Sequence, residues 1–248
     1  MLTIILILIT HFSFANVKIE DIDIGNQNEP VLLFLTNGKV KTIDKSTAFK
    51  DKDVIQFFKN GIQKKAFYFK EDHYYKSILE NYDQVENLFH SARREYKEES
   101  QCYHRAHVWA YEWRKMGVYS TKTWLFFSKK YIREHNFQWW FHVAPSVHVK
   151  TQDGLKERIL DVKYGKSPQK LKDWTNIFIR DGSDCPIVEK YTDQADFPES
   201  NSCYIIKSSM YYFQPYELEL HEINNITKTL WVKEEVQISY KDGFDILL

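Results

Sequence analysis

Two apolar runs near the start of the chain are separated by an Asn-Gly pair. Residues 29–43 read EPVLLFLTNGKVKTI, and Asn37-Gly38 interrupts them. An Asn-Gly pair between such runs is typical of a tight β-hairpin, because both residues accept the positive φ angles of its turn. Residues 66–71, AFYFKE, predict another strand. Residues 72–98 then place apolar and charged positions at helical spacing, which predicts one or two helices.

The clearest helical pattern lies in the middle of the chain. Its apolar positions recur at spacings of three and four residues, which puts them on one buried face. They are Cys102, Ala106, Trp109, Ala110 and Trp113. Ser100 is expected to cap this helix, and Gly117 is expected to end it. The pattern therefore places a cysteine at the N-terminal end of the buried stripe.

The second half of the chain alternates between strand and helix patterns. We expect strands at residues 122–128, 137–151, 154–165, 203–220 and 228–240, and a helix at 167–181 with Ser167 as its cap and Pro168 at its first position. Gln152-Asp153-Gly154 predicts a hairpin turn between the second and third of these strands. The order of elements indicates an α+β fold, with an antiparallel sheet packed against the helix that carries Cys102.

The first fifteen residues, MLTIILILITHFSFA, hold an apolar run followed by small residues. This pattern predicts an export signal that is cleaved after Ala15, and a buried strand is the alternative. The run is too short to span a bilayer, and no later segment is apolar enough. We therefore divide the chain into a signal peptide at 1–15, an N-terminal segment at 16–93 and a main domain at 94–248. The N-terminal segment is either a pro-region or an integral part of the fold.

The composition excludes some partners. The chain has 34 basic and 34 acidic residues, so its formal net charge is zero. This balance argues against nucleic acid or an anionic membrane as the main partner. We expect a secreted or periplasmic protein, and oxidising compartments favour disulfides. Cys185 and Cys203 lie 18 positions apart and are the favoured pair, which leaves Cys102 free. Three reduced cysteines are the alternative.

A cysteine nucleophile needs a stabilised thiolate, a nearby base and a group that orients the base. The N-terminal end of a helix favours the negative charge on Cys102, and its free N–H groups can stabilise an oxyanion. His142, within the apolar strand WWFHVAP, is the candidate base. Asp161 ends the next strand of the predicted hairpin, where a buried carboxylate needs a partner. The alternative is a buried thiol, a core histidine and a strand-end aspartate with no catalytic role.

Neighbouring residues carry less specific patterns. His104 and His107 follow the cysteine, but offsets of two and five do not share one helical face, so we expect no metal site and no cofactor. Arg105 either pairs with a carboxylate or is solvated. Strand side chains alternate, so one of the two tryptophans before His142 is expected in the core. We assign the other, Trp140, to the wall of a substrate groove, with Tyr103 as a second candidate.

Three motifs in this order resemble the protein-glutaminase family. They are CYHRAH at 102–107, WWFHVAP at 139–145 and RILD at 158–161. The family consists of secreted bacterial protein-glutamine deamidases, whose fold is related to transglutaminases and papain-like cysteine proteases. The resemblance covers roughly residues 95–215, and residues 54–79 look more loosely like the end of the family's pro-region.

The resemblance implies that Cys102 is the nucleophile, His142 the base and Asp161 the orienting acid of a glutamine deamidase. The expected partner is a protein or peptide with an accessible glutamine, and the expected state is a monomer. A transglutaminase or cysteine protease of the same fold is one alternative, and an exported binding protein with an aromatic surface is another. The chain departs from the family pattern after the acid, where Val162-Lys163 stands in place of Pro-Ser.

Overall fold

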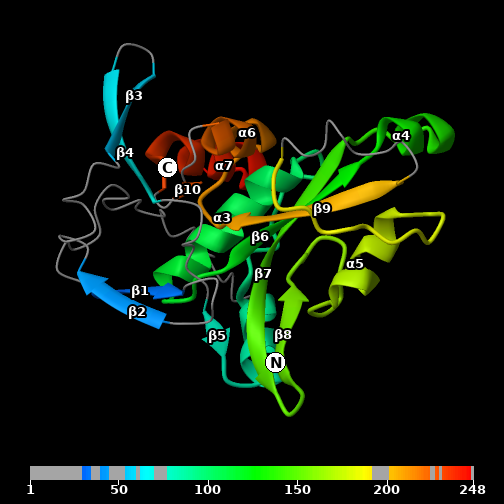
Figure 1. The fold of residues 1–248 in the computed structure, drawn as a ribbon, viewed down its shortest axis with the longest axis horizontal. Coiled ribbons are helices and arrows are strands. Elements are labelled where there is room, and N and C mark those ends of the chain that lie inside the picture. Colours follow the sequence, from blue (N-terminus) through cyan, green and yellow to red (C-terminus); the bar gives the residue numbers. More distant parts are fainter. Residues whose placement is uncertain are drawn as a thin grey trace, which may run out of the picture.

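The computed structural model describes residues 30–34, 40–44, 54–59, 62–69, 77–191, 201–223, 227–228 and 231–246. The predicted signal peptide and the Asn37-Gly38 turn lie outside these residues. The α+β architecture is confirmed, with helices packed around a central sheet (Figure 1). None of the described helices combines the length and the apolar character that a bilayer span requires.

The central sheet has five strands. They are β5 (Ile78–Leu79), β6 (Thr121–Phe127), β7 (Phe141–Thr151), β8 (Gly154–Ile159) and β9 (Cys203–Ser209). The order is β5-β7-β6-β9, and β8 pairs with β7. All pairings are antiparallel except that of β5 with β7. The predicted β7–β8 hairpin is confirmed, with Thr151 opposite Gly154. This hairpin carries both His142 and the residues that lead to Asp161.

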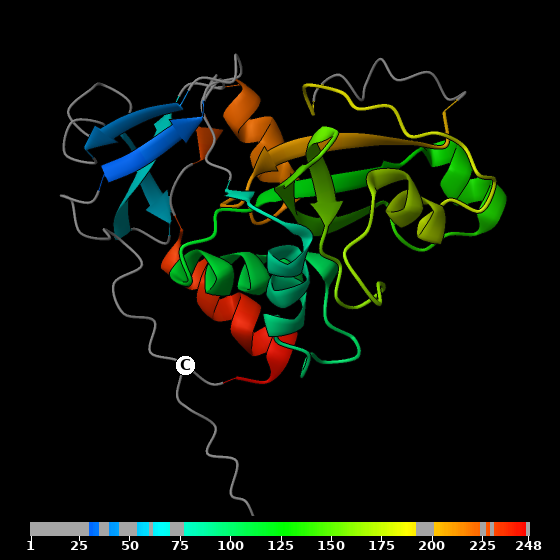
Figure 2. The same cartoon turned by 90° about the horizontal axis from the view of Figure 1, so that it is seen from below.

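Helices cover the sheet on both faces. They are α2 (Tyr82–Ser91), α3 (Cys102–Lys115), α4 (Lys129–His135), α5 (Leu171–Phe178), α6 (Pro215–Ile223) and α7 (Lys233–Phe244). In Figure 2, α2 (teal), α3 (green) and α7 (red) lie together on one side of the sheet. The side chains of α4 and α5 pack into a second cluster, around Leu125, Ile159 and Trp174. The helix that begins at Cys102 is therefore held between the sheet and two other helices.

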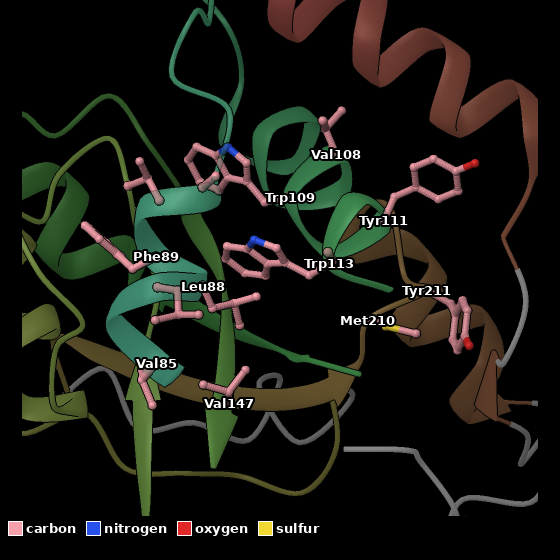
Figure 3. Close-up of a cluster of buried hydrophobic side chains, with 14 of the residues drawn as sticks. Val85, Leu88, Phe89, Val108, Trp109, Tyr111, Trp113, Val147, Met210 and Tyr211 are labelled. Carbon is pink, nitrogen blue, oxygen red and sulfur yellow. The ribbon is translucent and has the colours of Figure 1, made fainter. Parts of the chain in front are cut away.

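The largest apolar cluster joins α2, α3 and the sheet. Val85 and Phe89 of α2 meet Trp109 and Trp113 of α3 above Val147 of β7, and all five are buried (Figure 3). Burying large apolar side chains stabilises a fold by about 1.5–3 kcal/mol each. Although the sequence assigns α2 and β5 to the N-terminal segment, they share one core with α3.

A buried ion cluster fixes the C-terminal elements to one another. Lys228 of β10 (Thr227–Lys228) donates to Glu217 of α6 and to Glu235 of α7, at 2.7 Å in each case. All three side chains are buried. Breaking a buried ion pair by removing one partner leaves an uncompensated charge. The cluster therefore ties α6 and α7 to the strand between them.

Two hairpins precede the main sheet. β1 (Pro30–Phe34) pairs with β2 (Val40–Asp44), and β3 (Val54–Lys59) pairs with β4 (Ile62–Phe69), both antiparallel. The predicted first hairpin is thus confirmed in its strands. The C-terminal β10 pairs with β4, placing Thr227 opposite Phe69. The backbone of the N-terminal segment is therefore connected to the C-terminal part of the chain.

Several predicted elements are wrong. In the described part of residues 72–98, one of the expected helices forms as α2, but Ile78 and Leu79 form a strand alongside β7 instead of helix. The strand predicted at 228–240 is mostly the helix α7, whose Val236, Tyr240 and Phe244 recur every four residues and pack against α3. Their strand propensity is overridden by this contact, since intrinsic preferences are weak.

The predicted strand at 203–220 ends at Ser209, and its second half forms α6. The helix predicted at 167–181 begins only at Leu171, because Gln169 still bridges to Ile159 as extended backbone. The predicted cap Ser100 is also wrong, since Gln101 occupies the N-cap position of α3. The helix ends at Met116, and Gly117 follows with a φ of 85°. Glycine is favoured at such a position.

Candidate functional site

Cys102 is the first residue of α3 and is the free cysteine of the described chain. Cys185 and Cys203 form a disulfide, as the sequence favours. No described side chain caps the N-terminus of α3, and its first turn contains no acidic residue. The first N–H groups of a helix have no partner within the helix. The thiol of Cys102 therefore lies beside unoccupied backbone donors.

His142 and Asp161 form a closely bonded pair. His142 Nε2 lies 2.6 Å from Asp161 Oδ2. The same carboxylate oxygen accepts a hydrogen bond of 2.9 Å from Nε1 of Trp174. Both members of the pair are about 98% enclosed, with exposed fractions of 1% and 2%. A buried carboxylate is stable only when it is paired and hydrogen-bonded, and both conditions are met here.

The imidazole also reaches the cysteine. Because Nε2 is engaged by Asp161, Nδ1 is the ring nitrogen that remains for other partners. Cys102 and His142 line the same cavity, and the interaction with the Cys102 side chain contributes to the raised pKa of His142. The structure thus brings the three predicted residues together, from the start of α3, the start of β7 and the residues after β8.

The charges of the pair support each other. Burial alone opposes protonation of His142, but the Asp161 charge, with hydrogen bonds to Asp161 and to Cys102, raises its pKa to about 9. Burial likewise opposes ionisation of Asp161, but the neighbouring His142 charge and the bonds from His142 and Trp174 hold the pKa of that carboxyl below its usual range. An imidazolium–carboxylate pair therefore persists across neutral pH.

Aromatic rings enclose the imidazole. The ring centroids of Trp139, Tyr164, Trp174 and Phe178 lie between 4.4 and 5.8 Å from that of His142. Trp139 stacks on it with an interplanar angle of 21°. These contacts restrict the rotation of the ring and exclude water from its faces. The orientation set by Asp161 is thus reinforced by packing.

A cavity of about 290 Å³ opens over the cysteine and the histidine. Its walls come from three segments: residues 98–102 with Arg105, residues 138–142, and Lys163 with Tyr164. Trp139 and Trp140 are 39% and 48% exposed. The cavity therefore contains Cys102 and His142 and has the exposed Trp139 and Trp140 among its lining residues, which suits a side chain that enters from a larger partner.

The predicted binding residues are placed differently from one another. Trp140 lines the cavity, as the sequence predicts. Trp139 lines it too, and the expectation that one tryptophan lies in the core is wrong, because β7 begins only at Phe141 and strand alternation does not apply before it. Tyr103 is not among the residues that line this cavity. Its ring packs against Phe141 and Phe213 instead.

Arg105 is buried, so the alternative of a solvated arginine is wrong. It is 2% exposed, and its Nη1 donates to the hydroxyl of Ser100 at 2.8 Å and to the carbonyl of the same residue. Ser100 stands two residues before Cys102. A guanidinium bonded in this way fixes the backbone that leads into α3. Its charge also contributes to holding the pKa of Asp161 low.

The two histidines of the CYHRAH motif face other partners. His107 Nδ1 lies 2.8 Å from Nζ of Lys122, and both side chains are fully buried. Burial and the Lys122 charge place the pKa of His107 well below its usual value. His104 packs against Phe213. These two histidines therefore contact Lys122 and Phe213, whereas Cys102 lines the cavity with His142.

Sequence reasoning missed several residues of the site. Trp174 and Tyr164 lie outside the quoted motifs, and their contacts follow from the way α5 and the loop after Asp161 fold over His142. One signal was available for Trp174, because it lies on the apolar face of a strongly amphipathic helix. Apolar spacing predicts burial of the ring, but it does not predict the acceptor of its N–H group.

Part of the chain is similar to a known protein family. A family model described as glutaminase matches residues 56–178, which include Cys102, His142 and Asp161. No curated protein matches the chain.

Three solved structures are similar to the chain. A crystal structure of protein-glutaminase is 16% identical over 67% of this chain and 89% of that chain, with a TM-score of 0.42. The NMR structure of protein-glutaminase from Chryseobacterium proteolyticum is 15% identical over 56% and 77%, with a TM-score of 0.39. A crystal structure of pro-protein-glutaminase is 15% identical over 83% and 71%, with a TM-score of 0.41.

Proposed function

We propose that the chain is a member of the glutaminase family whose model matches residues 56–178, and that it hydrolyses glutamine side chains of proteins to glutamate and releases ammonia. The observation that carries this proposal is the cavity that Cys102 and His142 line together, with the imidazole held by a buried carboxylate. We assign Cys102 as nucleophile, His142 as acid and base, and Asp161 as the residue that orients the imidazole.

The first half of the reaction uses the positive charge on His142. Sγ of Cys102 attacks the amide carbon of the glutamine side chain, and the C=O oxygen becomes an oxyanion. The free N–H groups at the start of α3 are suited to stabilise this oxyanion. Protonated His142 then gives its proton to the departing nitrogen, which leaves as ammonia. A pKa of about 9 keeps this proton available at neutral pH.

The second half uses the neutral imidazole. After ammonia leaves, the glutamine carbon is bound to Cys102 as a thioester. His142 takes a proton from water, and the hydroxide adds to the thioester carbon. The C–S bond breaks, the thiolate of Cys102 is restored with protonated His142 beside it, and glutamate is released. Asp161 keeps Nε2 of the ring engaged throughout, so the same nitrogen serves both halves.

Substrate contact is assigned to the rim of the cavity. We propose that Trp140 packs against the segment that carries the glutamine, because its ring is nearly half exposed and lines the cavity. Tyr103 has a weaker basis for substrate contact, because its ring is occupied by Phe141 and Phe213. It remains a candidate that substitution can test.

Export and domain division are further parts of the proposal. The disulfide between Cys185 and Cys203 supports an oxidising location, secreted or periplasmic, with the signal peptide at residues 1–15. The N-terminal segment at 16–93 is proposed as a pro-region or integral part of the fold. Since α2 and β5 lie in the common core, a cleavage that leaves the main domain intact would fall before residue 77.

The decisive experiment measures ammonia released from a glutamine-rich protein by the wild type and by Cys102→Ala. Cys185→Ala is the matched control, because it also removes a cysteine but lies away from the cavity. We expect ammonia from the wild type and the control only, with glutamate replacing glutamine in the mass spectrum. New peptide ends would indicate a protease, and crosslinks with an added amine would indicate a transglutaminase. Equal ammonia from Cys102→Ala would overturn the assignment of the nucleophile.

A further inference from the structure

Lys163 bridges two walls of the cavity. It stands two residues after Asp161, where the chain departs from the family pattern. Its Nζ donates a hydrogen bond of 2.8 Å to the carbonyl oxygen of Glu98, which belongs to the segment before the nucleophile helix. Both residues line the cavity. A single side chain therefore connects the loop that follows the acid to the segment that precedes Cys102.

The ammonium of Lys163 is held between two rings. It lies 5.4 Å from the ring centroid of Tyr96 and 6.0 Å from that of Tyr164. Arg105 approaches the same Tyr96 ring at 5.8 Å. Cations are attracted to the faces of aromatic rings at such distances. The position of the ammonium is thus defined by a carbonyl and two rings, so the bridge has a fixed geometry.

The other contacts of the segment before α3, residues 97–101, join it to helices and not to the loop after Asp161. Lys97 N donates to the carbonyl of Gly243 at 2.8 Å, and the Lys97 ammonium bonds to Asp245. Ser100 is bonded to Arg105 of α3. These contacts fasten the segment to α3 and to the end of α7. Among the hydrogen bonds given for the described residues, the bond from Lys163 is the one that fastens it to the loop after Asp161.

The segment held in this way forms the outer wall of the site. Glu98, Glu99 and Gln101 are exposed and line the cavity together with Trp139 and Trp140. A substrate segment that presents a glutamine to Cys102 therefore meets residues 98–101 at the cavity. The position of these residues relative to the loop after Asp161 depends on the bond from Lys163, whereas Ser100, closer to Cys102, is fixed independently by Arg105.

We propose that Lys163 is a positioning residue that sets the substrate affinity of the cavity by fixing the wall at residues 98–101 against the loop after Asp161. The inference rests on the proposed deamidase function and extends it to the residue that shapes the entrance. It separates two roles. Lys163 controls the outer wall and therefore KM, and Arg105 supports the start of α3 and therefore the chemical step.

The test compares Lys163→Met with Lys163→Arg on the full chain. Methionine keeps the length of the side chain but cannot donate, whereas arginine retains a charged donor. KM and kcat are measured for ammonia release from a glutamine peptide blocked at both ends. We expect KM to rise about tenfold in Lys163→Met, the factor that corresponds to ~1.4 kcal/mol, with little change in kcat. Lys163→Arg should restore most of the affinity.

Lys172→Met is the matched control. Lys172 also donates to a backbone carbonyl, that of Gly182 at 3.0 Å, but it does not line the cavity. A similar rise of KM in this control, or a failure of Lys163→Arg to restore affinity, would assign the effect to a general loss of structure. An unchanged KM in Lys163→Met would overturn the proposal.

A second readout does not depend on activity. The amide of Ser100 donates to the carbonyl of Lys97, so hydrogen exchange at residues 97–101 reports on the order of the wall. We expect faster hydrogen exchange at residues 97–101 in Lys163→Met than in the wild type. Lys172→Met should exchange at the wild-type rate. If the wild type releases no ammonia, the proposed function fails while the exchange result still decides whether Lys163 fixes the wall. Unchanged exchange would contradict the bridging role.

Discussion

Replacing Asp161 by asparagine removes the charge that keeps His142 protonated and keeps the shape of the side chain. His142 is enclosed, so it has no solvent to replace the lost carboxylate. Its pKa of about 9 results from the Asp161 charge overcoming the burial that opposes protonation. Without that charge, burial dominates. We therefore expect the pKa of His142 to fall below its ordinary value of 6.5 in Asp161→Asn.

The magnitude follows from the two pKa values. A histidine whose pKa rises from 6.5 to about 9 gains about 3 kcal/mol in the preference for its charged form. Because the folded pKa is raised, this stabilisation is fully present below pH 6.5 and is lost as the pH rises through about 9. The free energy of unfolding of the wild type should therefore decrease by about 3 kcal/mol over this window. Asp161→Asn should lack this decrease.

The assay is an NMR titration of the ¹⁵N-labelled histidine side chains, with chemical denaturation at each end of the pH window. Cys102→Ala is the comparison, because Cys102 contributes less than Asp161 to the raised pKa of His142. We expect the midpoint to fall in both variants and to fall further in Asp161→Asn. A wild-type midpoint near 6.5, or a midpoint near 9 that survives in Asp161→Asn, would refute the electrostatic account of the pair. The kcat of Asp161→Asn should fall by about 10⁴, by analogy with the acid of serine protease triads.

Three further predictions concern other parts of the structure. Cys185→Ser should lower the free energy of unfolding by about 2–4 kcal/mol in urea denaturation, because the disulfide of Cys185 with Cys203 closes a loop of 18 positions. Equal stability of the wild type with and without reductant would contradict this prediction. Lys228→Met should lower the free energy of unfolding by about 3–5 kcal/mol, since the buried carboxyl groups of Glu217 and Glu235 lose the ammonium that they share. Glu235→Gln should cost far less at pH 6, because burial raises the pKa of Glu235 to about 7 and the residue then carries a proton; equal costs for the two variants in urea denaturation would argue against this charge balance. Trp140→Ala should raise KM about tenfold with kcat retained in steady-state ammonia assays, and an unchanged KM would exclude Trp140 from substrate contact.

The candidate site could be predicted from the sequence where local patterns specify geometry. Helical spacing predicts a helix that begins at Cys102, and α3 does so, but its residues 104–111 are buried on all sides and not on one face. The Gln152-Asp153-Gly154 turn predicts the β7–β8 hairpin. His142 lies near the start of β7 and Asp161 just after β8, and Nε2 of His142 is 2.6 Å from Oδ2 of Asp161. Both signals act over short distances in the chain. They therefore remain visible without knowledge of the tertiary structure.

The remaining parts depend on contacts between distant residues. The strand-forming residues of α7 adopt a helix because α3 offers them a surface, and propensity alone gives the opposite answer. Arg105 is buried because Ser100 and Tyr96 surround it, although its position beside the apolar face allows solvation equally well. The bridge from Lys163 to Glu98 joins residues 65 positions apart. No periodic pattern encodes such a pairing.

The shared core of α2 and α3 has a consequence for any shortened form of the chain. A protein that starts at residue 94 would lack Val85, Leu88 and Phe89, and the faces of Trp109 and Trp113 that they cover would meet water. Large exposed apolar patches promote self-association. A soluble and active fragment should therefore begin at or before Ser77. The amide of Ser77 donates to the carbonyl of Tyr119, and β5 begins at the next residue. The first residue of the stable unit is then set by tertiary contacts, and it lies upstream of the predicted start of the main domain at residue 94.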